Sequence, residues 1–310
     1  MRSVRARAHA SIANLGYGFD VFALCVTAGF DEVQLSLGGR GSVLVVEGEA
    51  AAGVPRRASA NSAGVALAKL LRDHGITRTV RARLRKGVPA GGLGSSGASA
   101  VAAVVAANRL LGLGLTREAL VPYAAHGETA SAGTAHADNV AASLFGGLVV
   151  VERLAPARIL RLVPRGALRI AIARPQLRLT TAAARRVLPR RLALDQCAQA
   201  CARAAMIVAA LQAGDVRGFG RALEGSLTDR ARAALIPGFA EVCASARRAG
   251  AAGATVSGAG PAVMAAVDAG RADPRAVAAA MRAAFGRAGL EARTLVARVG
   301  GGARVVEVRR

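Results

Sequence analysis

The sequence has 310 residues, enough for about two domains, and 53% of them are hydrophobic, which excludes disorder along the whole chain. Lys and Arg together number 42 against 19 Asp and Glu, which gives a net charge of +23. Only Lys69 and Lys86 are lysines, so the other 40 are arginines. They are scattered without a basic block and with few aromatic residues, so we expect a charged surface and no nucleic-acid site.

No segment predicts a membrane span or a secretory leader. The longest apolar run, residues 98–107, is far shorter than the roughly 18–20 residues that cross a bilayer. The basic N-terminal residues are not followed by the apolar core of a signal peptide. The cysteines at 25, 197, 201 and 243 form no CxxC motif, and we interpret them as small buried residues of a reducing compartment rather than as a metal half-site at 197 and 201. We therefore expect a cytoplasmic protein.

The first half of the chain mixes strand and helix patterns. Apolar residues alternate at 3–8, 32–37, 79–85 and 148–152, which predicts strands. Helices are predicted at 61–74, 96–111, 116–131 and 138–145. The helix at 96–111 is apolar on all sides and rich in small residues, so we expect it at the centre of the core.

The second half repeats this mixture without a repeated sequence. Strands are predicted at 168–173, 253–257, 262–267, 292–299 and 305–308, and helices at 181–188, 192–213, 237–249 and 274–288. The elements do not follow a strict βαβ order, which favours the α+β class. We predict two domains, residues 1–154 and 155–310.

A glycine-rich loop precedes the central helix and predicts an anion-binding site. Glycines let backbone N–H groups approach an anion, and the helix that follows presents the positive end of its dipole. Hydroxyl groups in the first helical turn donate hydrogen bonds to phosphate or bind Mg²⁺. An ordinary connector before a helix is the alternative, and the loop has no Walker lysine. The candidate cofactor-binding residues here are Pro89, Gly91, Gly92, Leu93, Gly94, Ser95, Ser96, Gly97, Ala98 and Ser99.

This loop resembles the second motif of the GHMP kinases, Pro-x-x-x-Gly-Leu-Gly-Ser-Ser-Ala. Here Pro89 stands three rather than four positions before Gly92, and Gly97 replaces the usual Ala. The resemblance implies a two-domain α+β fold, with an N-terminal domain like ribosomal protein S5 and a ferredoxin-like C-terminal domain. It also implies ATP and Mg²⁺.

Two further segments resemble the other motifs of that family. Residues 11–20, Ser-Ile-Ala-Asn-Leu-Gly-Tyr-Gly-Phe-Asp, are similar to the first motif of the homoserine kinases within it, which makes Asn14 and Asp20 candidate substrate residues. Turn formation is the alternative for both. Residues 253–263 resemble the third, glycine-rich motif and add Gly258 and Gly260 to the phosphate site. Asn61 corresponds to an Asn near the adenine pocket.

The segment His-Ala-Asp-Asn-Val-Ala at 136–141 resembles the homoserine kinases again. The resemblance implies that His136 and Asn139 bind substrate, and that Glu128 binds Mg²⁺ with Ser96, an ordinary set of hard oxygen ligands. In this interpretation Asn139 orients the acceptor hydroxyl. Asp138 is the rival that takes its proton, and direct transfer to phosphate is the other route.

Two arginines complete the predicted site. Arg185 follows Thr-Thr-Ala-Ala-Ala, and Arg232 stands three residues before Leu235; both match arginines that grip the substrate carboxylate in the family, a task suited to the guanidinium fork. Together the motifs imply a kinase that phosphorylates the hydroxyl of L-homoserine and that forms a homodimer. The alternatives are another small-molecule kinase of the family, acting on mevalonate-pathway substrates or shikimate, or a basic nucleic-acid-binding protein on the same scaffold.

Overall fold

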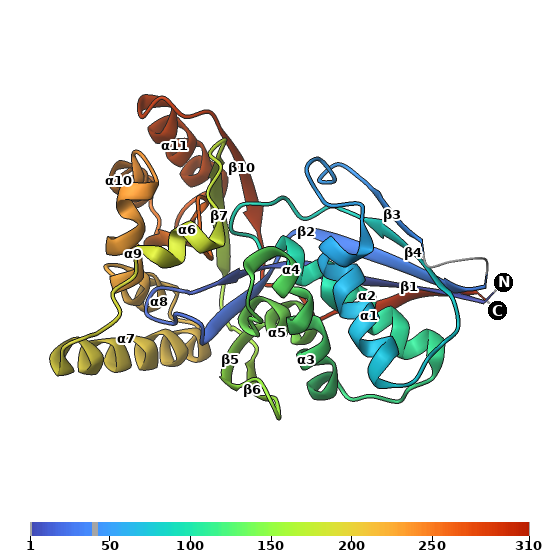
Figure 1. Ribbon diagram of the computed structural model, residues 1–310. Helices are drawn as coiled ribbons and strands as arrows, with labels where there is room; N and C mark the ends of the chain where they lie inside the picture. The colour runs from blue at the N-terminus through green and yellow to red at the C-terminus, as the bar shows by residue number, and fades with distance from the viewer. Residues whose placement is uncertain (1, 39–42, 310) are drawn as a thin grey trace.

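The computed structural model describes residues 2–38 and 43–309 (Figure 1). The strands are β1 (Ser3–Ala13), β2 (Phe22–Leu37), β3 (Leu44–Glu47), β4 (Val80–Arg85), β5 (Leu148–Arg153), β6 (Arg158–Leu162), β7 (Leu168–Pro175), β8 (Gly253–Val256), β9 (Val263–Asp268), β10 (Ala292–Ala297) and β11 (Arg304–Arg309). The α-helices are α1 (Ser62–Asp73), α2 (Ser95–Leu111), α3 (Arg117–Gly127), α4 (Thr129–Ala132), α5 (Asp138–Phe145), α6 (Thr181–Arg186), α7 (Leu194–Ala213), α8 (Val216–Leu223), α9 (Leu227–Arg232), α10 (Phe239–Arg248) and α11 (Pro274–Arg287). Short 3-10 helices occupy Ala58–Ala60 and Ala233–Leu235.

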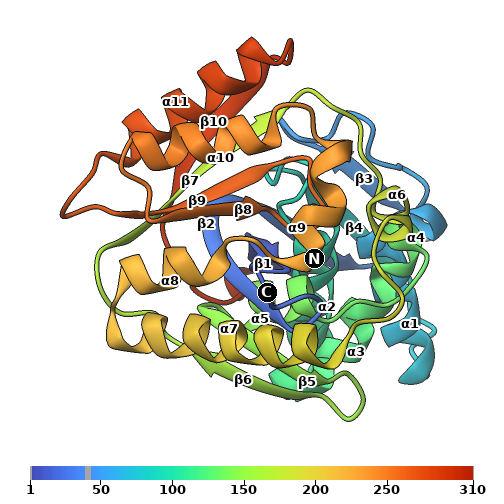
Figure 2. The ribbon, with the colours of Figure 1, turned by 90° about the vertical axis from the view of Figure 1, so that its left-hand side faces the viewer.

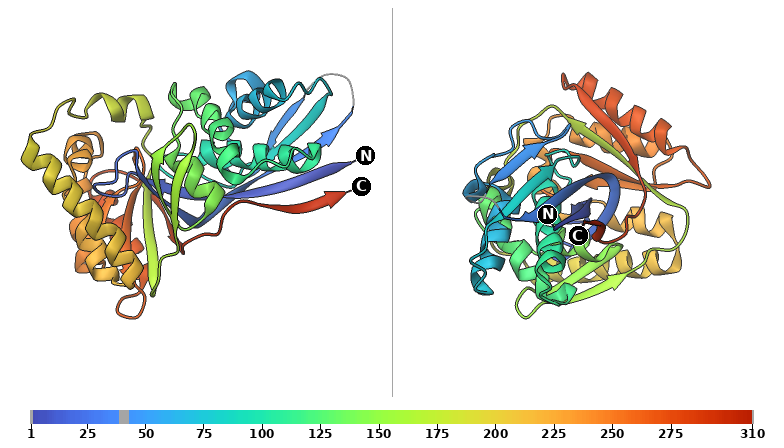
Figure 3. Two further views of the ribbon diagram at one scale, coloured as in Figure 1. Left: turned by 90° about the horizontal axis from the view of Figure 1, so that it is seen from below. Right: turned by 90° about the vertical axis from the view of Figure 1, so that its right-hand side faces the viewer.

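The first sheet has the strand order β11-β1-β2-β4-β3, and β5 and β6 extend it from the start of β2. β1 pairs antiparallel with both β2 and β11, whereas β3 and β4 run parallel. The long β1–β2 ladder carries alternate buried residues on the face that the helices cover. Because β11 pairs with β1, the two ends of the chain lie side by side (Figure 3).

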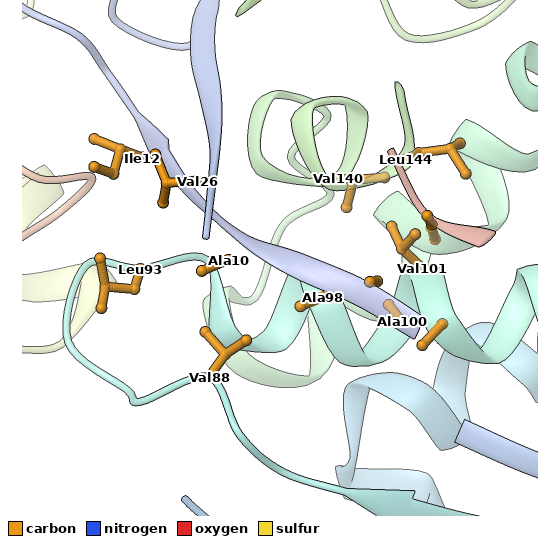
Figure 4. Close-up of a cluster of buried hydrophobic side chains, with 14 of the residues drawn as sticks. Ala10, Ile12, Val26, Val88, Leu93, Ala98, Ala100, Val101, Val140 and Leu144 are labelled. Carbon is orange, nitrogen blue, oxygen red and sulfur yellow. The ribbon is translucent and has the colours of Figure 1, made fainter. Parts of the chain in front are cut away.

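Helix α2 lies at the centre of this half of the molecule. It contacts β1 and β2 of the sheet and also α1, α3 and α5. Its small side chains are buried on all sides, which lets the backbones of its neighbours approach closely. Figure 4 shows apolar side chains of β1, β2, α2 and α5 meeting around the first turns of this helix, among them Ile12, Val26 and Val101. The prediction of a central, closely packed helix is confirmed.

The second sheet is antiparallel, with the order β10-β7-β9-β8. This is the strand order of a ferredoxin-like unit. Helices cover both faces of the sheet, α10 and α11 on one and α7 and α8 on the other (Figure 2). Strand β7 therefore buries both of its sides: Ala171 and Ala173 pack toward α10 and α11, and Ile170 and Ile172 join the core that includes α7 and α8.

The α+β class is confirmed, and most predicted elements appear at the expected residues. The predicted helix at 116–131 is interrupted near Glu128, where α3 ends and α4 begins. The sequence pattern missed α8, α9, β3 and β6, and it found only the end of β2. The two sheets do not divide the chain at residue 154, because β6 and β11 both belong to the first sheet.

The burial predicted for the cysteines is wrong for two of the four. Cys25 and Cys243 are buried, but Cys197 and Cys201 are exposed on the first turns of α7. These turns extend beyond the rest of the domain, so the apolar residues there have nothing to pack against in the described chain. Among the described residues no group of three His, Cys, Asp or Glu side chains could hold a metal ion, and no helix is long and apolar enough to cross a membrane.

Candidate active site

A cavity of about 330 Å³ collects most of the predicted site residues from distant parts of the chain. Its walls come from the end of β1, the glycine loop before α2, the start of α5, helices α6 and α9, and the loop between β8 and β9. The predicted residues that line it are Asn14, Asn61, Gly91, Gly92, Gly94, Ser95, Ser96, Ser99, Glu128, His136, Asp138, Asn139, Arg185, Arg232, Gly258 and Gly260. Pro89, Leu93, Gly97, Ala98 and Asp20 lie behind this lining or at its edge, and Leu93 and Ala98 are fully buried beneath the loop.

The glycine loop takes a path that L side chains rarely adopt. Gly91, Gly92 and Gly94 have φ angles of +96°, +102° and +62°. The loop is held from both sides, because the Ser11 N–H donates to the Leu93 carbonyl (3.1 Å) and the Ser257 hydroxyl donates to the Gly92 carbonyl (2.6 Å). The first and third motifs therefore fix the second, which brings its N–H groups and the N-terminus of the 17-residue helix α2 to one wall of the cavity.

Ser96 and Glu128 fit a divalent cation. The Ser96 hydroxyl donates to Glu128 Oε2 (3.1 Å), while Glu128 Oε1 is buried and has no hydrogen-bond partner among the described residues. Burial raises the pKa of Glu128 to about 7, and the Ser96 hydrogen bond opposes this shift. A buried carboxylate oxygen without a partner, next to a hydroxyl at the wall of an open cavity, provides two hard oxygen ligands and leaves the other positions to water and phosphate.

The two predicted arginines line the same cavity. Arg185 Nη2 lies 2.5 Å from Asp20 Oδ1 and 3.2 Å from His136 Nδ1. Arg232 is almost fully buried, and its guanidinium donates to the carbonyls of Gly258 (2.9 Å) and Ala184 (3.3 Å). These contacts fix both guanidinium groups before any ligand is present.

His136 acts here as a neutral hydrogen-bonding group. Burial lowers its pKa, and the charge of Arg185 lowers it further. A neutral ring protonated on Nε2 fits both of its contacts: Nδ1 accepts from Arg185, and Nε2 donates to the Thr134 hydroxyl (2.8 Å).

The turn of the first motif is closed by its own polar residues. Asn14 and Asp20 both have left-handed backbones, with φ angles of +58° and +56°, and Asn14 Oδ1 accepts from the Asp20 N–H (2.9 Å). Asn14 thus forms the turn and lines the cavity at the same time. Asn61 also has a local role, because it caps α1 through the Ala63 N–H (3.0 Å) and donates to the Pro55 carbonyl (2.7 Å).

Asp138 and Asn139 begin helix α5 and line the cavity. The Ser11 hydroxyl donates to Asn139 Oδ1 (2.9 Å), which fixes the orientation of the amide. Asp138 is buried, its Oδ1 accepts from the Asn139 N–H (2.7 Å), and desolvation raises its pKa to about 6.

Several residues of the site were not singled out from the sequence. Phe19 lies under both arginines, with their guanidinium carbons 5.1 and 5.7 Å from its ring centroid. Lys86 and Asp31 form a buried ion pair beneath the glycine loop. Two signals pointed to them: Phe19 belongs to the first motif of a chain with few aromatic residues, and Lys86 is one of two lysines among 40 arginines.

Comparisons with known proteins match both halves of the chain to one family. The GHMP kinases N terminal domain matches residues 61–147, and the GHMP kinases C terminal domain matches residues 207–287. The chain is 39% identical to the homoserine kinase of Thermoplasma acidophilum over 97% of this chain and 96% of the relative, and 38% identical to that of Halorubrum lacusprofundi over 98% and 99%. The crystal structure of homoserine kinase from Cytophaga hutchinsonii has a TM-score of 0.89 at 33% identity, covering 98% of this chain and 97% of that one.

Proposed function

The chain belongs to the GHMP kinase family, and we propose that it is an ATP-dependent homoserine kinase. It transfers the γ-phosphoryl group of ATP to the side-chain hydroxyl of L-homoserine and produces ADP and O-phospho-L-homoserine, in the biosynthesis of threonine. The two-domain fold that the motifs predicted is confirmed by the similarity to a solved homoserine kinase over almost the whole chain.

One observation supports the choice of substrate: the glycine loop, which suits phosphate, and a group of charged side chains that suits an amino acid line the same cavity. The glycine loop and the α2 N-terminus supply donors for the phosphates of ATP. Arg185 and Arg232 offer two guanidinium groups to an α-carboxylate, and Asp20 beside them offers a carboxylate to an α-ammonium group. A zwitterionic amino acid satisfies all three of these charges.

Asn139 lines the same cavity, where it is placed to orient the acceptor hydroxyl. That oxygen forms a bond to the γ-phosphorus as the bond between the γ-phosphorus and its bridging oxygen breaks, and ADP keeps the electron pair. An amide takes no proton at neutral pH, so the hydroxyl proton passes either to the Asp138 carboxylate or to a phosphoryl oxygen. Most of the rate enhancement then comes from positioning and from neutralising phosphate charge.

Ser96 and Glu128 are the residues that would hold Mg²⁺ with the nucleotide. When bound, the ion neutralises charge on the phosphates. The protein's own contribution is a desolvated carboxylate beside the first turn of α2. Within the part of the chain that the structure describes, Glu128 Oε1 has no hydrogen-bond partner that the ion would displace.

The test is coupled ADP release with MgATP and a panel of acceptors: L-homoserine, mevalonate, shikimate and galactose. Turnover with L-homoserine alone supports the proposal. Turnover with mevalonate or shikimate would keep the phosphate site and overturn the role of Asp20, because neither acceptor carries an ammonium group.

The expectations about partners belong to the same proposal. We infer a cytoplasmic homodimer that does not bind nucleic acid. Exposed arginines lie on helices in both halves of the molecule, such as Arg72 on α1, Arg248 on α10 and Arg287 on α11, which supports an even charge distribution. The molar mass measured by light scattering during size-exclusion chromatography tests the dimer. Salt-dependent binding to a DNA duplex would contradict the expectation that the protein does not bind nucleic acid.

A further inference from the structure

Lys86 is a buried exception in a chain that otherwise uses arginine. Of the two lysines, Lys69 lies on α1 and pairs with Asp73 one turn later at a partly exposed position. Lys86 follows β4 directly and its side chain is 2% exposed. Arg and Lys differ in shape more than in charge, since the ammonium group is compact and the guanidinium is a broad planar fork. A buried lysine in this composition therefore indicates a place where only a compact cation fits.

The surroundings of Lys86 Nζ form a closed set of oxygen acceptors. Nζ lies 2.5 Å from Asp31 Oδ2, 2.7 Å from Ser95 Oγ, 2.9 Å from the Ser95 carbonyl and 2.9 Å from Ser99 Oγ. An ammonium group has three hydrogens, and four protein oxygens already surround it. Although Lys86 borders the cavity, its donors are occupied within the protein.

Asp31, the other member of the ion pair, also has hydrogen-bond partners on both of its carboxylate oxygens. Its side chain is fully buried; Oδ1 accepts from the N–H groups of Gly87 (2.9 Å) and Val88 (3.0 Å), and Oδ2 accepts from the Ser99 hydroxyl (2.6 Å) as well as from Lys86. Hydrogen bonds of this kind are what allow an ion pair to remain charged away from water.

This network ties the two ends of the glycine loop to each other. Val88 enters the loop and Ser95 leaves it into α2, and the Ser95 hydroxyl donates to the Val88 carbonyl (2.8 Å) while it accepts from Lys86. The Ser95 side chain is thereby turned into the network, so its hydroxyl does not serve as a free donor to phosphate. What remains at the cavity wall from this residue is the backbone.

We propose that Lys86 and Asp31 are positioning residues that close the base of the phosphate loop and hold its N–H groups in place for ATP. This rests on the proposed kinase function and assigns Lys86 to the loop, not to the phosphates. A direct phosphate ligand and a loop anchor make opposite predictions for Asp31, because Asp31 has no route to the nucleotide except through Lys86 and the loop.

The experiment measures ADP, adenosine and L-homoserine binding by calorimetry on the full chain, for wild type, Lys86→Met, Asp31→Asn and the control Lys69→Met. We expect Lys86→Met and Asp31→Asn to weaken ADP binding by a similar factor, about tenfold or more, because a small displacement of the loop is enough to lose its contacts. Adenosine and L-homoserine binding should stay within about twofold of wild type. Lys69→Met should bind every ligand like wild type.

The contrary outcomes are distinct. Weak ADP binding by Lys86→Met alone, with normal binding by Asp31→Asn, would make Lys86 a phosphate ligand and overturn the proposal. Equal loss of all three ligands would reduce the pair to a general structural role. A wild-type protein that binds no ADP would instead refute the kinase function.

Two less disruptive variants test the anchoring role if Lys86→Met and Asp31→Asn do not fold. Ser99→Ala removes one hydrogen-bonding partner of the pair without leaving a charge unpaired, and Lys86→Arg keeps the charge in a broader group. Both should weaken ADP binding and spare L-homoserine. Unchanged ADP affinity in both would overturn the anchoring role and the requirement for a compact cation.

Discussion

Replacing Gly92 with alanine tests whether the two glycine motifs form one phosphate site. Gly92 has a φ angle of +102°, where an L side chain is strained. Its added Cβ atom would overlap the carbonyl oxygen of Ser257, a backbone atom of the third motif that cannot rotate away. The same residue accepts the 2.6 Å hydrogen bond from the Ser257 hydroxyl, so the change also disturbs the contact that joins the loops.

The backbone strain and the overlap with Ser257 set the expected size of the effect on stability and on activity. A residue forced into such a backbone region costs about 1–3 kcal/mol, which for a chain of this size lowers Tm by about 2–5 °C. Relief of the overlap moves one loop away from the other by about 1 Å, and a displacement of that size costs about 100-fold in rate when it misplaces reacting groups. We therefore expect kcat/KM for ATP to fall about 100-fold in the coupled ADP assay, with a smaller change in KM for L-homoserine.

Gly97 provides the matched control in the same motif. It has ordinary helical backbone in the first turn of α2, and a Cβ atom there would lie 3.4 Å from Asn139 Cβ, an ordinary contact. Gly97→Ala should stabilise the fold by about 0.5–1 kcal/mol and keep nearly all activity. Wild-type kinetics for Gly92→Ala, or equal damage from Gly97→Ala, would refute the argument that the contact between the loops shapes the site.

Five other perturbations probe the rest of the cavity. Arg232→Ala should raise KM for L-homoserine more than it lowers kcat, and an unchanged KM would remove this residue from the carboxylate grip. Asp20→Asn should raise the same KM by up to about fivefold while sparing KM for ATP, as steady-state titrations of each substrate would show. Asn139→Ala should lower kcat substantially at saturating substrate, and a normal kcat would show that the hydroxyl is oriented by another group. If Asp138 takes the proton, kcat rises with pH through its raised pKa of about 6, because the carboxylate is protonated below that pH; Asp138→Asn should remove this limb, and an unaltered profile would favour proton transfer to phosphate. Chelation with EDTA should abolish turnover, and Glu128→Gln should raise the Mg²⁺ concentration needed to restore it.

The sequence predicted the elements of the fold well where the pattern of apolar residues alone determines which surface of an element is buried. Helix α2 is apolar on all sides, and only a central position buries such a helix. The alternation of apolar and polar residues did not predict the first half of β2. Its first five residues are all buried, and the β1–β2 ladder has a bulge opposite His9 and Ala10, so this half lacks a clean alternation. Helices α8 and α9 are only eight and six residues long, and α8 contains two glycines, so neither gives a long helical pattern.

The site was predictable as a set of motifs but not as a geometry. The glycines and hydroxyl groups of the loop predict a phosphate site, because few other local structures require glycines and hydroxyl groups directly before a helix. The sequence does not reveal that the Ser95 hydroxyl turns inward to Lys86, or that Arg185 reaches Asp20 across 165 positions. Such contacts depend on the tertiary arrangement of the elements, which no local pattern contains.

In the proposed mode of substrate binding, the Asp20–Arg185 ion pair favours an amino acid over other alcohols. Both side chains are about one-third exposed, so their mutual attraction is modest and a ligand can compete for it. L-homoserine offers a carboxylate to the arginines and an ammonium group to Asp20, and each partner of the broken pair regains an opposite charge. An acceptor with a carboxylate alone draws Arg185 away and leaves Asp20 without a cation, next to a newly bound anion of the same sign. The preformed pair therefore penalises acceptors that lack the ammonium group, and it does so without excluding them by size.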